Sequence, residues 1–311
     1  MEAQPKCNLI IDSCCDLPFE VIDRPGVQLL EFPYIDEKGE HSDDLYRTIT
    51  PHEFYEGMRA GSQPSTAQVP VTVFQDVFSK AIESGVPTVY LSFTSGLSGS
   101  FNTAVMMRDQ LIAEHPEAEL YVVDTYLASV AEALLVYEAL NQRDNGMTAR
   151  ELAAWAEEAR YFVDAEFMVD DLESLRRGGR IPSTVAYAGA KLDVKPMLGI
   201  TTDGKLTFAG VARGRKKGIK QLAEYYRKHV AKEGSDNCVV IANADCPKDA
   251  DRLKEALAKV DEGVLFLESS IGPVIGSHVG PDMLAIVFWG DDRREDLTVA
   301  DRIARKVKKG E

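Results

Sequence analysis

Short apolar runs alternate with longer segments of helical spacing along the first half of the chain. The runs, rich in Val, Ile, Leu and aromatic residues, predict strands at 7–12, 27–35, 87–93 and 119–124. The longer segments predict helices at 70–85, 99–114, 126–143 and 148–162. Nearly continuous apolar strands between helices are typical of a parallel sheet that is covered on both faces. We therefore expect a parallel α/β domain over residues 1–160.

The pattern changes beyond residue 160. Strands are predicted at 198–202, 205–212, 237–243, 264–269 and 284–289, and helices at 216–233 and 247–260. Asp203-Gly204 separates the first two of these strands, and this dipeptide favours a two-residue hairpin between antiparallel strands. We therefore expect an α+β domain with a mainly antiparallel sheet over 161–290, followed by a helical tail over 291–311.

Composition and charge narrow the class of protein. The 311 residues are 45% hydrophobic and include 35 Lys and Arg against 50 Asp and Glu, which gives a formal net charge of −15. This excess of acid argues against a protein whose main task is to bind nucleic acid or to adsorb to anionic membranes. The N-terminus does not read as a signal peptide, and no window of 18 uncharged apolar residues occurs. A soluble, cytoplasmic protein is expected.

The sequence contains no familiar cofactor or metal motif. A glycine-rich dinucleotide fingerprint, a P-loop and a His-Glu-x-x-His motif are all missing. The five cysteines include no Cys-x-x-Cys pair, and no two of the five histidines have the spacing of metal ligands on a turn or helix. We therefore expect neither a metal nor a cofactor.

The most informative stretch is Thr94-Ser95-Gly96-Leu97-Ser98-Gly99-Ser100, where a predicted strand ends and a helix begins. Free N–H groups at a helix start attract anions, and open α/β sheets bind ligands at the carboxyl ends of their strands. This Ser/Gly loop is thus a candidate carboxylate or phosphate site, and a well-capped helix explains it equally well. It also resembles a nucleophile elbow, but Ser100 stands where that motif has its last glycine.

Other polar residues stand in comparable settings. Asp12 and Ser13 end the first predicted strand, and Ser62 precedes the predicted helix at 70–85. His278 lies in a segment with three glycines and two prolines, 272–281, that predicts a shaped loop. A histidine in such a loop can donate a hydrogen bond to an anion or act as an acid or base, but a lone histidine more often has a structural role.

Three arginines flank the Gly178-Gly179 pair at the end of an amphipathic turn: Arg176, Arg177 and Arg180. Cations at a helix end are often simply solvated and suit the helix dipole. The alternative is that they face an acidic ligand or partner. The sequence pattern alone leaves both interpretations open.

In this order, the segments resemble the DegV family of bacterial fatty-acid-binding proteins over residues 7–290. The matching segments are Ile11–Leu17, Ser62–Ser65, Thr94–Ser100, Leu172–Ile181, Lys195–Leu198, Asp203-Gly204, Arg213–Lys217 and Gly272–Pro281. The resemblance implies an N-terminal parallel α/β domain related to one in dihydroxyacetone kinases and a C-terminal α+β domain. It also implies a long-chain fatty acid buried in a tunnel between them.

The resemblance further implies how the fatty-acid carboxylate is held: by hydroxyls of the Ser/Gly loop, by a hydroxyl just before Gln-Pro, and by a histidine. Carried over, the binding residues are Ser95, Thr94, Ser98, Ser62 and His278, with Asp12, Ser13 and Ser277 near the site. The family usually has Thr-Ser-Gln-Pro where this chain has Gly61-Ser62-Gln63-Pro64, so a hydroxyl is missing at Gly61. One lost hydrogen bond costs about 1 kcal/mol. Asp282 also stands where the family often has glycine.

Members of this family are carriers, so the resemblance implies a protein without catalytic residues. They present the acyl chain to a separate fatty-acid kinase, which phosphorylates the carboxyl group with ATP. The residues that correspond to the docking surface for this kinase are Arg180, Arg213 and Arg215. A carrier of this kind would contact the membrane transiently to exchange lipid.

Two other classes of function stay open. The first is a serine hydrolase or acyltransferase that uses Ser95 or Ser98 with His278, oriented by Asp12. The second is a phosphotransferase, suggested only by the kinase-related N-terminal fold and without a recognisable nucleotide site.

Overall fold

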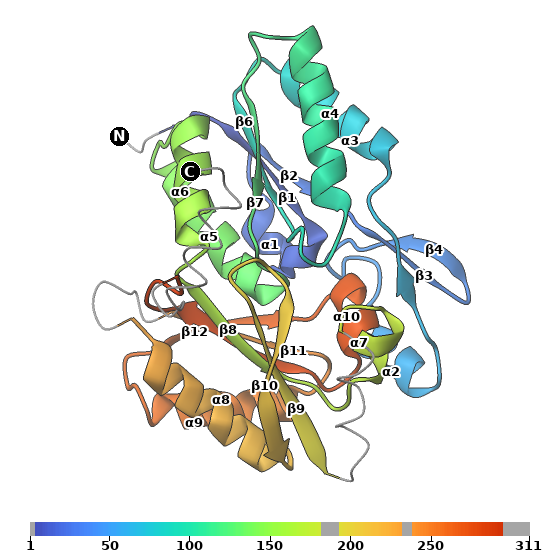
Figure 1. Ribbon diagram of the computed structural model, residues 1–311, viewed down its shortest axis with the longest axis vertical. Coiled ribbons are helices and arrows are strands. Elements are labelled where there is room, and N and C mark those ends of the chain that lie inside the picture. The colour runs from blue at the N-terminus through green and yellow to red at the C-terminus, as the bar shows by residue number, and fades with distance from the viewer. Residues whose placement is uncertain (1–3, 182–192, 232–237, 295–311) are drawn as a thin grey trace.

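The computed structural model describes residues 4–181, 193–231 and 238–294 and contains two large sheets and one small one (Figure 1). The first sheet consists of four parallel strands in the order β2-β1-β6-β7: β2 (Val27–Leu30), β1 (Asn8–Asp12), β6 (Thr88–Ser92) and β7 (Leu120–Asp124). Helices α3 (Val71–Glu83) and α4 (Ser100–Glu114) cover one face, and α5 (Val130–Asp144) and α6 (Ala149–Ala159) cover the other. The predicted parallel α/β unit is confirmed.

The second sheet has six strands in the order β10-β9-β8-β13-β11-β12. They are β10 (Leu206–Arg213), β9 (Val194–Ile200), β8 (Val163–Met168), β13 (Leu284–Trp289), β11 (Cys238–Asn243) and β12 (Leu265–Ser270). All neighbours are antiparallel except β11 and β12. Helices α8 (Arg215–His229) and α9 (Pro247–Ala258) pack on its outer face. The sheet is therefore mainly antiparallel, as predicted.

Helix α5 lies between the two large sheets, because it also contacts β8, β11 and β13. Ten of its fifteen residues are buried, as expected for a helix that is covered on most sides. One hydrophobic core includes residues of β1, β6, α5, β8 and β13. The two halves of the chain thus share a core instead of meeting through a polar interface.

The remaining elements are short. They are η1 (Ser13–Cys15), α1 (Phe19–Ile22), α2 (Pro51–Arg59), α7 (Glu173–Arg177), α10 (Pro273–Val279), and a small sheet of β4 (Gly39–Ser42), β3 (Pro33–Asp36) and β5 (Ser65–Thr66). The strand predicted at 27–35 is therefore two strands. The chain leaves the parallel sheet after Leu30 and pairs again from Pro33 in the small sheet.

Further details of the prediction were wrong. Strand β8 and helix α2 were not predicted. Residues 272–281, predicted as a loop, contain α10. Pro273 stands at the first position of α10, where its missing N–H costs nothing. The hairpin between β9 and β10 has five loop residues, not two, because Ile200 pairs with Leu206.

The predicted division at residue 160 falls between α6 and β8. From residue 295 on, the predicted helical tail lies outside the described residues. No helix in the described ranges is both long enough and apolar enough to cross a membrane.

Candidate functional site

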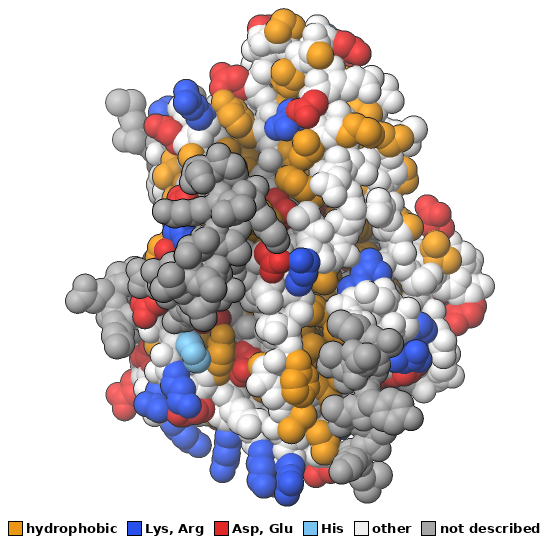
Figure 2. Space-filling model, viewed as in Figure 1, with side chains coloured by type: hydrophobic (Ala, Val, Ile, Leu, Met, Phe, Trp, Pro, Cys, Tyr) orange, Lys and Arg blue, Asp and Glu red, His pale blue; other side chains and the backbone are white. Residues whose placement is uncertain are grey.

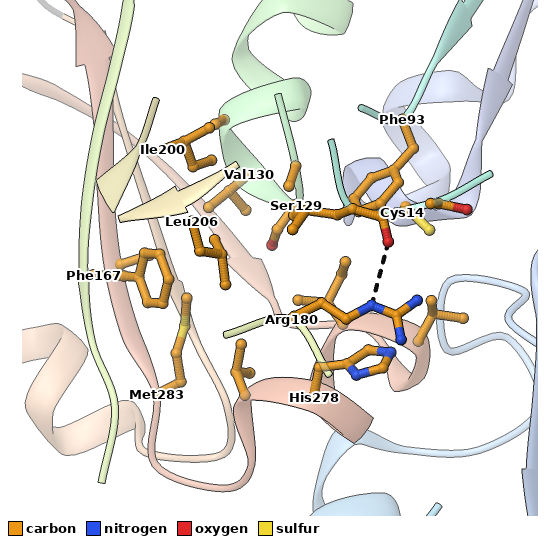
Figure 3. Close-up of a pocket in the computed structure, with 18 of the residues that line it drawn as sticks. Cys14, Phe93, Ser129, Val130, Phe167, Arg180, Ile200, Leu206, His278 and Met283 are labelled. Atoms are coloured by element: carbon orange, nitrogen blue, oxygen red, sulfur yellow. Dashed lines mark hydrogen bonds between the residues drawn. The ribbon is translucent and has the colours of Figure 1, made fainter. Parts of the chain in front are cut away.

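A cavity of about 280 Å³ lies between the two large sheets, beside the N-terminal end of α5 (Figure 3). Small side chains on facing elements make this space: Ala128 and Ala131 on the side of α5, and Ala165 and Ala285 on the six-stranded sheet. Larger apolar side chains complete the wall, including Phe93, Phe167, Ile200, Leu206, Val274 and Val287. The interior is therefore mostly apolar.

Polar groups gather at one end of the cavity. The lining there includes His278 of α10, Thr66 of β5, Ser98 of the Ser/Gly loop, and Arg180 just after α7. Figure 3 shows His278 and Arg180 together at this end, with Phe167, Leu206 and Ile200 on the opposite side. The cavity thus has a polar end and a mainly apolar end; Glu166 of β8, whose pKa burial and then the charge of Asp164 raise to about 7, also lines it.

His278 is mostly buried and incompletely bonded. Its Nε2 lies 2.8 Å from the hydroxyl of Thr66, and its buried Nδ1 has no hydrogen-bond partner among the described residues. Burial, and then the positive charges of Arg180 and Arg177, lower its pKa to about 4. The ring is therefore neutral at pH 7, with one N–H donor and one acceptor nitrogen.

Arg180 joins the two halves of the chain at the cavity. Its Nε donates to the carbonyl of Leu97 at 3.2 Å, and its Nη1 donates to the carbonyl of Gly178 at 2.6 Å. Burial lowers its pKa, and no described carboxylate lies within ion-pair distance of it. A half-buried guanidinium without an acidic partner leaves its charge available to a bound anion.

Of the Ser/Gly loop residues predicted to hold the carboxylate, only Ser98 lines the cavity. The hydroxyl of the fully buried Thr94 donates to the carbonyl of Gly204 at 3.0 Å, at the tip of the β9–β10 hairpin. The backbone N–H of Ser95 donates to a carboxylate oxygen of Asp124 at 3.2 Å. Thr94 therefore anchors the hairpin that covers the cavity.

Ser62 lies away from the cavity. Its hydroxyl donates to Glu37 Oε2 at 2.7 Å on the exposed side of the small sheet. Four residues later, Thr66 reaches the cavity and bonds His278. Thr66 stands two residues before Gln68, as the threonine of the expected Thr-Ser-Gln-Pro pattern stands before its glutamine. The spacing of Thr66 and Gln68 is therefore the sequence signal for this hydroxyl, whereas Gln63-Pro64 points to Ser62.

The residues predicted near the site have local structural partners. Asp12 accepts hydrogen bonds from the N–H groups of Phe93 and Cys14 and from the hydroxyl of Tyr90, and burial raises its pKa to about 7. Ser13 accepts from the N–H of Phe32. Ser277 donates to the carbonyl of Pro273. None of the three predicted residues lines the cavity, whereas the neighbouring Cys14 does.

A serine–histidine pair is not assembled in the described part of the chain. His278 bonds Thr66, the hydroxyl of Ser98 bonds Ser100, and Asp12 makes no contact with His278. The geometry does not provide the nucleophile–base contact that acyl transfer requires.

Within the described ranges, one group of side chains on the surface has metal-ligand chemistry: His52 and Glu56 of α2, with Asp245 after β11. Arg59 already pairs with both carboxylates, at 2.9 Å from Glu56 and 2.5 Å from Asp245. We assign no metal to this group, because the guanidinium occupies the place of a cation.

The arginines predicted to dock a kinase fall into three different settings. Arg180 lines the cavity, as described above. Arg213, at the end of β10, is exposed. Arg215 is partly buried and pairs with Asp249 and, at 3.6 Å, with Asp170.

Comparison with known proteins gives one consistent result. The family model described as "Uncharacterised protein, DegV family" matches residues 6–291. A DegV domain-containing protein of Clostridium perfringens is 35% identical over 288 residues, which cover 93% of this chain and 99% of the relative. A Thermotoga maritima protein whose structure "reveals fatty acid binding function" is 29% identical, with a TM-score of 0.78 over 92% of this chain and 100% of its own.

A more distant structure is that of the Fatty Acid Kinase (Fak) B3 protein of Streptococcus pneumoniae, loaded with linoleic acid. It is 18% identical, with a TM-score of 0.80 over 92% of this chain and 100% of its own. At this identity the likeness concerns the fold. The family match spans nearly all of the chain and agrees with the two-sheet architecture, so this chain belongs to the DegV family.

Proposed function

We propose that this protein binds a long-chain fatty acid in the cavity between its two large sheets. The observation that carries the proposal is a mostly apolar cavity with one polar end; among the described residues, the guanidinium there has no acidic partner and the neutral histidine has one nitrogen without a hydrogen bond. The carboxylate would lie among Arg180, His278, Thr66 and Ser98, and the acyl chain would extend toward Phe167 and Leu206 along the apolar wall.

The energetics favour such a ligand. A buried carboxylate needs hydrogen-bond donors, and this end offers the Nη2 of Arg180, which bonds no described group, one free proton of the bonded His278–Thr66 pair, and the hydroxyl of Ser98 once it turns from Ser100. Each buried methylene contributes about 0.8 kcal/mol, so a chain of about 15 methylenes contributes roughly 12 kcal/mol before the cost of immobilising the ligand. The expected affinity is micromolar or better.

A comparison of head groups tests the proposal. The purified protein is extracted and its lipids are identified by mass spectrometry; then binding of a long-chain acid is compared with that of the alcohol of equal length. We expect a co-purified fatty acid and at least tenfold tighter binding of the acid. Arg180→Gln should reduce this preference, whereas Arg213→Gln, at an exposed position, should not. Equal affinity for acid and alcohol, or no binding of either, would refute the proposal.

We also propose that the bound acid is presented to a separate ATP-dependent fatty-acid kinase. The fold likeness to the Fak B3 protein supports this step as an analogy of fold. The exposed cations near the end of β10 and the start of α8 suit an acidic partner face: Arg213, Lys216, Lys217 and Lys220. Figure 2 shows Lys and Arg side chains gathered along the lower edge of the molecule, in the region of α8 and α9.

Charge reversal separates docking from lipid binding. Arg213→Glu should impair kinase-dependent formation of acyl phosphate while fatty-acid affinity stays within twofold of wild type. Arg215→Glu is the unsuitable choice, because it breaks the ion pair with Asp249 and should lower the melting temperature. Unchanged phosphorylation by Arg213→Glu and by a second reversal at Lys217 would remove this face from the docking surface.

A further inference from the structure

The N-terminal end of α10 is held by two carboxylates from the other half of the chain. Asp16 follows η1, and its Oδ1 accepts the N–H of Gly272 at 2.9 Å. Asp43 follows β4, and its Oδ2 lies 3.4 Å from the N–H of Val274. Both carboxyl side chains are buried, with 2% and 0% of their residues exposed. They supply hydrogen-bond acceptors to backbone N–H groups that have no partner within the helix.

Other polar atoms at this junction are also bonded across it. The second oxygen of Asp16 accepts the hydroxyl of Ser129 at 2.5 Å, at the start of α5. The carbonyl of Ile271, just before α10, accepts the hydroxyls of Tyr46 at 2.6 Å and Tyr55 at 2.7 Å. The start of α10 is thus bonded to the N-terminal half on both its donor and its acceptor side.

The junction leaves no room for a side chain at two glycine positions of α10 and its start. A Cβ placed on Gly272 would lie 2.5 Å from Asp16 Oδ1 and 3.0 Å from Asp43 Oδ2. One turn later, a Cβ on Gly276 would lie 2.5 Å from the hydroxyl of Tyr55. The glycines let the carboxylates and the tyrosine approach the helix backbone directly, so small displacements of α10 are resisted.

Helix α10 is also one side of the candidate binding site. Its residues Val274, Ile275 and Val279 line the cavity, and His278 stands in its last turn. A helix of two turns moves as a unit, so the position of its first turn sets the position of His278. We infer that Asp16 and Asp43 form a clasp that positions α10 and, through it, His278 at the polar end of the cavity. The effect on ligand affinity rests on the proposed function, whereas the placement of His278 does not.

The clasp is built mainly from acids, without an opposing cation among the described groups that face it. Asp12 and Glu132 lie near Asp16, and Asp44 and Glu31 lie near Asp43, with the phenols of Tyr46 and Tyr55 beside both. Burial raises the pKa of Asp43 to about 7, and burial together with the charge of Asp43 raises the pKa of Asp16 well above its ordinary value.

The raised pKa of Asp43 gives the clasp a testable pH dependence. For an acid whose pKa is higher in the folded than in the unfolded state, stability is full below the unfolded pKa and falls as pH rises through the folded one. For Asp43 that window runs from about 4, its ordinary value, to about 7. Asp43→Asn, which cannot ionise, should remove its share of the decline in stability across this window.

The test compares neutral and truncated variants of the clasp. Asp16→Asn keeps an oxygen for the N–H of Gly272, and Asp16→Ala does not. We expect the Asn variant to bind fatty acid within threefold of wild type and the Ala variant at least tenfold more weakly. Asp164→Ala is the matched control, because Asp164 is a buried carboxylate that bonds Tyr225 on the outer side of the six-stranded sheet.

The direct readout is the imidazole signal of His278 in a long-range proton–nitrogen NMR spectrum, identified by its loss in His278→Gln. It should shift in Asp16→Ala and stay unchanged in Asp164→Ala, with or without lipid. If Asp16→Ala does not fold, Tyr55→Phe removes one hydroxyl from Ile271 and should shift the same signal by less. An unmoved signal in the folded clasp variants would overturn the inference. A shifted signal without any fatty-acid binding by wild type would overturn only the proposed function.

Discussion

The sharpest prediction separates two hydroxyls that lie four residues apart. Thr66→Val replaces the hydroxyl that bonds His278 Nε2 at 2.8 Å with a methyl group of similar size. Since His278 Nδ1 has no hydrogen-bond partner among the described residues, the substitution leaves both ring nitrogens without one in a mostly buried site. In the complex, a carboxylate placed beside Thr66 would then lack one donor. Leaving a buried polar group unsatisfied in the bound state costs about 1–3 kcal/mol, which corresponds to a loss of fatty-acid affinity of roughly 5- to 150-fold.

The comparison variant is Ser62→Ala. Ser62 bonds Glu37 outside the cavity, so its loss should change fatty-acid affinity by less than twofold. Thr66→Ser keeps the hydroxyl and should recover most of the affinity lost in Thr66→Val. The assay is titration calorimetry with one long-chain acid, with melting temperatures measured on the same samples. Weaker binding by Ser62→Ala together with normal binding by Thr66→Val would refute the placement of the carboxylate beside Thr66.

Three further predictions concern the same cavity. Gly178→Ala places a Cβ 2.1 Å from His278 Nδ1 and should weaken fatty-acid binding at least tenfold in titration calorimetry. Gly57→Ala is the control: its Cβ in α2 meets open space, so this substitution should leave fatty-acid binding unchanged. Ala165→Leu fills part of the cavity wall and should shift the preferred acid to a shorter chain in a titration series; an unchanged preference would place the acyl chain elsewhere. The pKa of His278 is lowered to about 4, so its contribution to stability is lost as pH falls from about 6.5 to about 4. In thermal unfolding, His278→Gln should lack that part of the decline in stability at low pH. An identical decline in wild type and variant would contradict the prediction.

Local sequence patterns were sufficient to predict most helices and strands. They failed mainly where contacts with residues distant in sequence determine the local structure. The parallel strands and their helices followed from apolar runs, because both faces of that sheet are buried. Strand β8 was missed, since the polar Asp164 and Glu166 interrupt its apolar run directly after a helix. Alternation of these residues with Val163, Ala165 and Phe167 is the signal of a strand whose two faces differ.

Helix α10 could not be predicted from its own residues. Its seven residues include a glycine and a proline, and its first turn depends on Asp16 and Asp43, which lie more than 200 positions earlier in the chain. The sequence did identify His278, because glycines and prolines on both sides marked a constrained segment. It could not show that the constraint is a helix, since the partners that stabilise the helix are distant in sequence.

The choice between Ser62 and Thr66 illustrates a second limit. Both hydroxyls lie in one polar segment before α3, and only the pairing of β5 with β3 directs Thr66 toward α10. The pairing is antiparallel and places Thr66 opposite Tyr34. A motif shows that a hydroxyl is needed near the carboxylate, whereas strand register determines which hydroxyl reaches it.

The charge of the chain, −15, makes the environment of Arg180 informative. With acidic residues in excess, a cation readily finds a carboxylate: Arg59 pairs with Asp245 and Asp282, and Arg215 pairs with Asp249. Arg180 is half-buried, and among the described residues it bonds only backbone carbonyls, because the polar side chains at its end of the cavity, such as His278 and Thr66, carry no negative charge. Burial of an uncompensated cation costs free energy, so a chain that retains one here gains most when a ligand supplies the missing anion. In an acidic protein, the unpaired guanidinium is therefore a better indicator of the ligand's charge than the net charge of the chain.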